Sequence, residues 1–340
     1  MKSSMNIKAL ALAVAAAFAA PAAFADNVQV YGLVDVGYLH QDAGHGAKNS
    51  ISSETGSGAG QLGFKGSEDL GNGLKASFQI EYSVLAAEGG SYADGAGVPQ
   101  LRQSWVALGG DFGTLTLGRD YAPTFITAFG GEYCGWCGLG SIAGMTKQGL
   151  RNSNMVKYNS PSFGGFGFAA AHTTGEQLGS SGGNVDEASL SYSGGPVNVS
   201  YAHRDAKNTA ATVKQKSDYL AGNVSFGIAK VYALWGKEKA SDSSVNESYA
   251  SLGASFKLGG GDLALETIRV KDKTAGDSDS KMASIGYFYF LSKRTTVYAQ
   301  YSKVTNDSNV KRDVYVGSDG LSLVAGDDPK QYTIGLRHTF

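Results

Sequence analysis

The sequence predicts an all-β chain, a 16-stranded antiparallel β-barrel that crosses a membrane, with short turns at one end and long loops at the other. Three observations predict this fold. The chain begins with a leader typical of exported proteins, apolar and polar residues alternate along most of its length, and the connections between the alternating segments are short and long in turn. A closed ring of strands suits a membrane because it leaves no backbone edge unpaired.

The first 25 residues have the composition of a cleaved signal peptide. Two lysines precede an apolar run that Pro21 interrupts, and the small-residue site Ala23-Phe24-Ala25 stands before Asp26. The sequence therefore predicts a signal peptide at 1–25 and an exported domain at 26–340. Removing the leader with its two lysines takes the formal net charge from −1 to −3, so nucleic acid is not an expected partner.

Period-two alternation is the main strand signal. Valines and other apolar or small residues occupy every second position from Val28 to Tyr38, and the same pattern returns at the C-terminus from Tyr332 to Phe340. Glycine is frequent, with 48 residues of 340, and proline is rare, with 6, as expected for strands joined by tight turns. The predicted strands are 27–38, 60–69, 73–85, 101–109, 113–119, 150–159, 163–173, 186–193, 195–203, 214–226, 228–237, 246–257, 261–272, 279–291, 293–304 and 330–340.

The connections separate a membrane barrel from a soluble sandwich. Short glycine-rich links, such as Gly259-Gly260-Gly261, alternate with long polar segments, of which 120–149 and 305–329 are the longest. Outer-membrane barrels have short periplasmic turns and longer extracellular loops, and an even strand number places both termini in the periplasm. Sixteen sandwich strands would more naturally form two domains, yet no linker or shift in composition divides this chain.

Seven stretches of the chain carry a family resemblance: Val30–Asp35, Leu62–Glu81, Leu115–Asp120, Arg151–Asn154, Tyr158–Pro161, Tyr289–Tyr301 and Gly335–Phe340. Together they resemble the general porins of Gram-negative outer membranes, of the kind common in β-proteobacteria. The resemblance implies a homotrimer of sixteen-stranded barrels, each with a water-filled pore narrowed by an inward-folded third loop. It also implies that Phe340 is similar to the terminal aromatic that the outer-membrane assembly machinery reads.

The expected function is passive diffusion of small hydrophilic solutes and ions across the outer membrane, with lipid and lipopolysaccharide as neighbours. A substrate-specific channel is the nearer alternative, with Tyr31, Tyr219 and Tyr232 as candidate lumenal aromatics. A barrel whose surface loops act in adhesion is the other. No enzymatic activity, cofactor or metal is expected, because the five histidines stand singly and no nucleophile elbow or zinc-protease motif is present.

Strand parity indicates which charges face the lumen. With Phe64 outward, Lys65 points inward; with Trp105 outward, Arg102 points inward; with Val156 outward, the same strand turns Arg151 and Lys157 inward. Arg102 and Arg151 match by motif the ladder of lumenal arginines in the resembling porins, which faces acidic groups on the third loop, whereas Gln61 stands where the family often has another arginine. The predicted constriction residues are Arg102, Arg151, Glu132, Asp120, Arg119, Gln61, Lys65, Asp35 and Glu81.

The only two cysteines, Cys134 and Cys137, lie in the presumed third loop with the spacing of a redox motif. No strand–helix pattern surrounds them as a thioredoxin-like motif requires, and no further ligands complete a zinc site. We expect a disulfide that staples the loop, since an exported chain passes through an oxidising periplasm, with two free thiols as the alternative. Finding two thiols when the denatured, non-reduced protein is titrated would contradict the staple.

Overall fold

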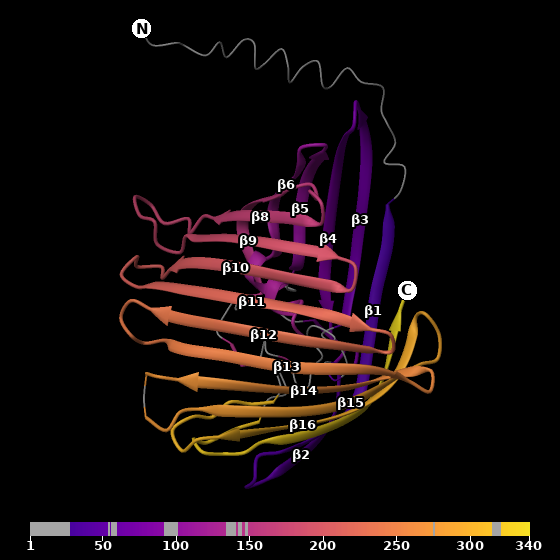
Figure 1. Ribbon diagram of the computed structural model, residues 1–340, viewed down its shortest axis with the longest axis vertical. Coiled ribbons are helices and arrows are strands. Elements are labelled where there is room, and N and C mark those ends of the chain that lie inside the picture. Colours follow the sequence, from indigo (N-terminus) through magenta and orange to yellow (C-terminus); the bar gives the residue numbers. More distant parts are fainter. Residues whose placement is uncertain are drawn as a thin grey trace.

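The computed structural model describes residues 28–340 except 54, 56–59, 92–100, 134–140, 142–144, 147–148, 275 and 315–320. The signal peptide and both cysteines therefore lie outside the described residues, and the predictions about them stay predictions. The described residues form one antiparallel sheet that closes on itself, because β1 (Gln29–Asp42) pairs with β17 (Lys330–Thr339). In Figure 1 the C-terminus accordingly lies beside β1. The predicted closed barrel is confirmed.

The wall has sixteen strand positions, although the described residues contain 17 strands. β2 (Ala47–Ser52) pairs with residues 37–42 of β1, and β3 (Gly60–Gly71) pairs with residues 29–33, so the two share one position in the wall. The other strands are β4 (Leu74–Val84), β5 (Leu101–Gly110), β6 (Gly113–Tyr121), β7 (Arg151–Asn159), β8 (Phe166–Thr173), β9 (Val185–Gly194), β10 (Val197–Lys207), β11 (Lys214–Phe226), β12 (Ala229–Ala240), β13 (Asn246–Leu258), β14 (Gly261–Asp272), β15 (Ser280–Phe290) and β16 (Thr295–Asn306).

The two faces of the wall follow the alternation in the sequence. Apolar side chains such as Leu190 and Leu252 point outward and are more than half exposed, at 55% and 58%. Polar and charged side chains such as Glu81 and Glu238 point inward and are buried. A soluble protein has the opposite arrangement, with an apolar interior and a polar surface. An apolar outside and a polar inside are expected where lipid contacts the barrel and water fills it. Among the described residues, no helix has the length and apolarity needed to span a membrane.

Tight turns close one end of the barrel, as predicted. The β3–β4 connection is the two-residue turn Asn72-Gly73, whose φ angles of 53° and 77° are both positive. A type I′ turn of this kind has the twist that matches antiparallel strands, and it favours the pair Asn-Gly. The loops at the opposite end are longer, and the described parts of the third and eighth of them extend into the barrel.

Candidate functional site

The third loop, residues 122–150, enters the barrel directly after β6. It begins with a short helix, α2 (Pro123–Phe129), whose first residue is a proline. Proline is well suited to the first helical position, where its missing N–H is not needed. The helix buries Pro123, Phe125 and Ala128 and contacts strands β8 to β11 from inside the barrel. The predicted inward-folded third loop is confirmed.

Hydrogen bonds hold this loop against the far wall. The side-chain nitrogen of Asn223 donates to the carbonyl of Gly130 at 2.8 Å, and the hydroxyl of Thr124 donates to Glu187 at 3.2 Å. The hydroxyl of Tyr133 donates to Asp262 at 3.1 Å. Burial, together with that carboxylate, raises the pKa of the Tyr133 hydroxyl, so the phenol stays protonated and remains a donor. The third loop is therefore fixed to strands β9, β11 and β14.

The eighth loop, residues 307–329, also enters the lumen and contacts the third. Arg312 donates from one terminal nitrogen to the carbonyl of Met145 at 2.8 Å, and its other terminal nitrogen lies 3.0 Å from Glu247 of β13. Met145 and Val314 are buried in one apolar cluster with side chains of β11 to β16. We call strands β9 to β16, against which both loops pack, the loop-covered wall.

The opposite side of the lumen carries the two arginines expected from the sequence. Nε of Arg102 lies 2.7 Å from Glu81, and Nη2 of Arg102 donates to the hydroxyl of Tyr121 at 3.3 Å. Nη2 of Arg151 donates to the same hydroxyl at 2.7 Å, and its guanidinium carbon lies 4.3 Å from the centre of the Tyr121 ring. The structure thus brings Arg102 and Arg151 together on one phenol, with Glu81 beside them.

Lys65 extends this cationic group along β3. Its ammonium lies 5.0 Å from the centre of the Tyr31 ring, and the Tyr31 hydroxyl donates to Glu81 at 2.8 Å. Gln61, on the same inward face of β3, lies opposite Leu33 and contributes no charge. We call Lys65, Arg102 and Arg151 the basic wall.

The other predicted constriction residues lie elsewhere. Glu132 is buried, accepts a hydrogen bond from Ser141 at 3.1 Å and lies close to Glu266 of β14, on the loop-covered side. Asp120 forms an ion pair with Lys157 within the barrel wall. Asp35 is fully buried and accepts a hydrogen bond from the Tyr298 hydroxyl at 2.5 Å.

Arg119 lies on the outward face. It stands opposite Ser104 in the β5–β6 register and has the same parity as Leu117, which is 47% exposed. Its guanidinium donates to the carbonyl of Leu101 at 2.8 Å and to the hydroxyl of Ser153 at 2.9 Å. This placement gives no support to the expected role of Arg119 in the pore.

The parity argument for Arg102 started from a wrong assumption about Trp105. Val106 is exposed and Ala107 is buried, so Trp105 points inward, and it lines a lumenal pocket with Gln79 and Lys65. Arg102 still reaches the lumen because the β4–β5 register shifts between Glu81 and Tyr82. A bulge of this kind places two neighbouring residues against one partner and redirects a side chain.

Sequence reasoning missed Tyr121, which joins the two arginines. The signal was its position directly after the Leu115–Asp120 stretch, at the end of the strand that enters the third loop. It also missed Arg312, because nothing in a polar loop segment indicates that the loop folds inward. Phe340, by contrast, lies at the seam: its backbone N–H and C=O both pair with Gly32 at 3.1 Å.

Comparison with known proteins agrees with this architecture. A family model described as Gram-negative porin matches residues 11–309. The chain is 31% identical to outer membrane porin protein 32 of Delftia acidovorans, over 99% of this chain and 100% of that protein, and 27% identical to an outer membrane porin protein of Bordetella pertussis, over 97% and 99%. Among solved structures, the anion-selective porin from Comamonas acidovorans superimposes with a TM-score of 0.82 at 27% identity, covering 92% of this chain and 99% of that one. The chain belongs to the Gram-negative porin family and is a passive diffusion channel of the cell outer membrane.

Proposed function

We propose that this porin passes anions in preference to cations, and that the basic wall sets the preference. The observation that carries the proposal is the pair Arg102 and Arg151, which share the hydroxyl of Tyr121 and, among the residues that the structure describes, have a single carboxylate, Glu81, beside them. Two guanidinium groups beside one carboxylate leave a net positive charge where the third loop narrows the channel. Charges in a constriction are poorly screened by water, so they discriminate strongly among permeating ions.

The acidic groups on the far side support a transverse field across the constriction. Glu132 lies close to Glu266 on the loop-covered wall, and the basic wall faces that side across the lumen. Two buried carboxyl groups this close do not both ionise, so together they contribute less negative charge than two separate acids. A polar solute passing between a positive and a negative wall is oriented by both, which favours hydrophilic over apolar solutes. The relative from Comamonas acidovorans, described as anion-selective, supports the same sign of selectivity.

The candidate aromatic residues support a general pore over a substrate-specific one. Tyr219 is fully buried beneath the inserted loops and Tyr232 is 5% exposed. Tyr31 directs its hydroxyl at Glu81. Residues held in these contacts do not form the exposed aromatic series on which a specific solute would slide.

We further propose that the barrel functions as a homotrimer whose outer face contacts lipid and lipopolysaccharide. One solved relative in fold, OmpT of Vibrio cholerae, is described in a trimer form. The broad apolar outer face described above is suitable for contact with lipid or with another copy. Light scattering of the unheated protein in detergent should give three times the chain mass, and a monomer mass would contradict the proposal.

The sign of selectivity is tested by the reversal potential of single channels in a planar bilayer under a salt gradient. We expect the wild-type potential to show anion preference, and the double substitution Arg102→Gln/Arg151→Gln to move it toward cations. A matched control is Lys239→Gln/Lys271→Gln, which removes two charges from exposed positions on the outward parity. An unchanged potential in the arginine variant would show that other residues form the selective constriction.

A further inference from the structure

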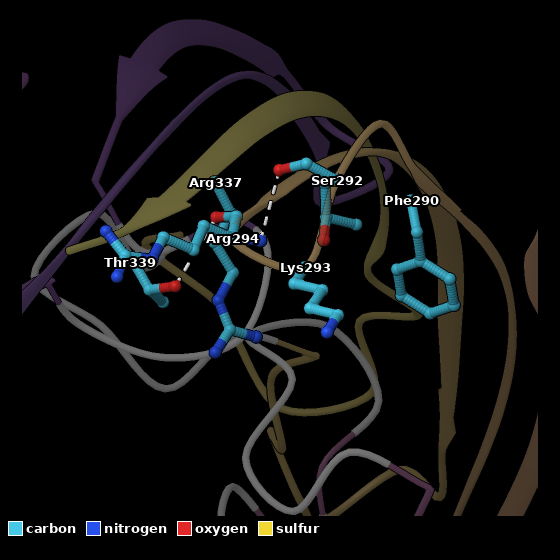
Figure 2. A pocket seen from close by; sticks show the side chains of 7 residues that line it. Phe290, Ser292, Lys293, Arg294, Arg337 and Thr339 are labelled. Atoms are coloured by element: carbon cyan, nitrogen blue, oxygen red, sulfur yellow. Dashed lines mark hydrogen bonds between the residues drawn. The ribbon is translucent and has the colours of Figure 1, made fainter.

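A pocket of about 470 Å³ lies at the periplasmic end of the barrel, beside the turn between β15 and β16. Two residues of the turn, Lys293 and Arg294, and one residue of β17, Arg337, bring three cations to its lining. Figure 2 shows the side chains of Lys293 and Arg294 extending from the turn in the same direction. The remaining lining residues are Phe290, Ser292, Thr296 and Thr339, three of which carry hydroxyl groups.

These three cations differ from the cations deeper in the barrel. Arg102, Arg204 and Arg312 each lie within 3.0 Å of a glutamate. Lys293, Arg294 and Arg337, in contrast, form no ion pair with any residue that the structure describes. Their charge is therefore available to a ligand instead of being neutralised by the fold.

The backbone that presents two of the cations is well fixed. The hydroxyl of Ser292 accepts hydrogen bonds from the N–H of Arg294 at 3.1 Å and from the N–H of Thr295 at 3.0 Å. The carbonyl of Arg294 accepts from the N–H of Thr339 on β17 at 2.9 Å. Because the turn is tied to the neighbouring strand, binding does not have to order it, which favours affinity.

Two described carboxylates stand near Arg337, and both are occupied by tyrosine hydroxyls. Asp35 of β1 lies opposite Arg337 in the β1–β17 register, is fully buried, and accepts the hydroxyl of Tyr298. Asp262 of β14, which like Arg337 acts electrostatically on Tyr133, accepts the hydroxyl of Tyr133 at 3.1 Å. Three cations against these two carboxylates leave the pocket positive.

We propose that this pocket is a second anion-binding site, separate from the constriction, for small oxyanions that carry more than one negative charge. A guanidinium presents parallel N–H donors to two oxygens of one anion, an ammonium adds a point charge, and threonine hydroxyls donate to the remaining oxygens. Inorganic phosphate has this chemistry and is the simplest probe. The proposed site depends on the proposed function only because anions would reach it through the pore. Binding of phosphate to the pocket does not require the channel to conduct.

Binding is tested by titration calorimetry of inorganic phosphate into the refolded barrel in detergent at low ionic strength. We expect Lys293→Gln/Arg294→Gln to weaken phosphate binding about tenfold or more, the loss expected when charge-assisted hydrogen bonds are removed. Arg337→Gln, on a different element, should weaken it as well. The matched control is Lys230→Gln/Lys257→Gln, two lysines at the same end of the barrel and on inward-facing positions of β12 and β13, neither of which lines the pocket. This control should retain wild-type affinity within about twofold, because screening weakens distant charges.

Two results would overturn the site. Equal phosphate affinity of the wild type and the Lys293/Arg294 variant would show that the pocket does not bind, and equal weakening in the lysine control would show only a general positive potential. Phosphate added to one side of a bilayer should also reduce the chloride current at lower concentration from the turn side than from the loop side. A channel that prefers cations but still binds phosphate through this pocket would refute the proposed function alone, whereas an anion-preferring channel without binding would refute this inference alone.

Discussion

The two walls of the lumen use similar side chains in different ways. On the loop-covered wall the charges are buried and paired: Glu187 lies 2.9 Å from Arg204, Glu247 lies 3.0 Å from Arg312, and Glu238 accepts hydrogen bonds from two tyrosines. On the basic wall, Arg102 and Arg151 are partly exposed and share one acid. Paired buried charges fix loop positions, and incompletely paired charges remain to act on solutes.

The largest effect should come from breaking the anchor between the loops and the loop-covered wall. Arg312→Ala would leave Glu247, which is only 1% exposed, without this cation and would free the carbonyl of Met145. Removing one partner of a buried ion pair costs about 3–5 kcal/mol. We expect a lower urea midpoint for the refolded barrel and noisier open-channel current. Lys311→Ala, which removes an exposed charge from the adjacent residue, should change neither, and an equal effect of both substitutions would contradict the anchor.

A matched pair of glycine substitutions, one on each wall, should have effects of intermediate size. A Cβ at Gly236 would lie 2.7 Å from the ring of Tyr219 on the loop-covered wall, and a Cβ at Gly63 would lie 2.2 Å from the ring of Tyr31 beside the basic wall. Tyr219 is fully buried and has no room to move, so Gly236→Ala should cost about 1–3 kcal/mol as overpacking.

Tyr31 is only partly buried, so Gly63→Ala should displace its ring from Glu81 with a smaller loss of stability. Its main effect should be on the reversal potential, which depends on the charges near Glu81. Chemical denaturation and bilayer recordings of both variants check the pair. A larger stability loss for Gly63→Ala than for Gly236→Ala would contradict the assignment of structural and permeation roles to the two walls.

The smallest effect should come from removing the one acid of the basic wall. Glu81→Gln keeps the shape of the side chain: its amide oxygen accepts from Arg102 and its amide nitrogen donates to the Tyr31 hydroxyl, but the negative charge is removed. We expect stronger anion preference, by roughly 1 kcal/mol or about a fivefold change in permeability ratio, the interaction of unit charges at contact in water. Recordings at high salt should reduce the difference. A shift toward cations would place Glu81 outside the selective region.

Much of the barrel could be predicted from the sequence because lipid and water impose period two on every strand. Val106 and Leu108 point outward and Glu81 inward for that reason. β2 was missed because its sequence, Ala-Lys-Asn-Ser-Ile-Ser, has weak strand character and forms a strand by pairing with the extended end of β1. The alternation of apolar and polar residues does not show that a weakly strand-forming segment will pair with a neighbouring strand.

The site was less predictable because its residues lie where shifts in strand register interrupt the alternation of inward and outward side chains. Arg102 stands at a register shift between β4 and β5, and β6 and β7 have another between Gly118 and Asp120, close to Arg151. The wrong assumption about Trp105 shows how parity misleads beside such irregularities. The contacts of Glu132 and Arg312 depend on how two loops fold into the barrel, which no local pattern encodes.

The seam between β1 and β17 has a consequence for folding kinetics. Its contacts join the two ends of the chain: the hydroxyl of Thr333, for example, donates to the carbonyl of Tyr38 across a sequence separation of 295 residues. Contacts of such long range form slowly, because the chain entropy of closing the loop is lost before the contact stabilises the fold. Until then both terminal strands expose unpaired edges, which are templates for association with other chains. The seam runs from the Asp42–Lys330 pair to the Leu33–Thr339 pair, and Phe340 adds a last backbone pair with Gly32, so a chain truncated before β17 should persist in an aggregation-prone state.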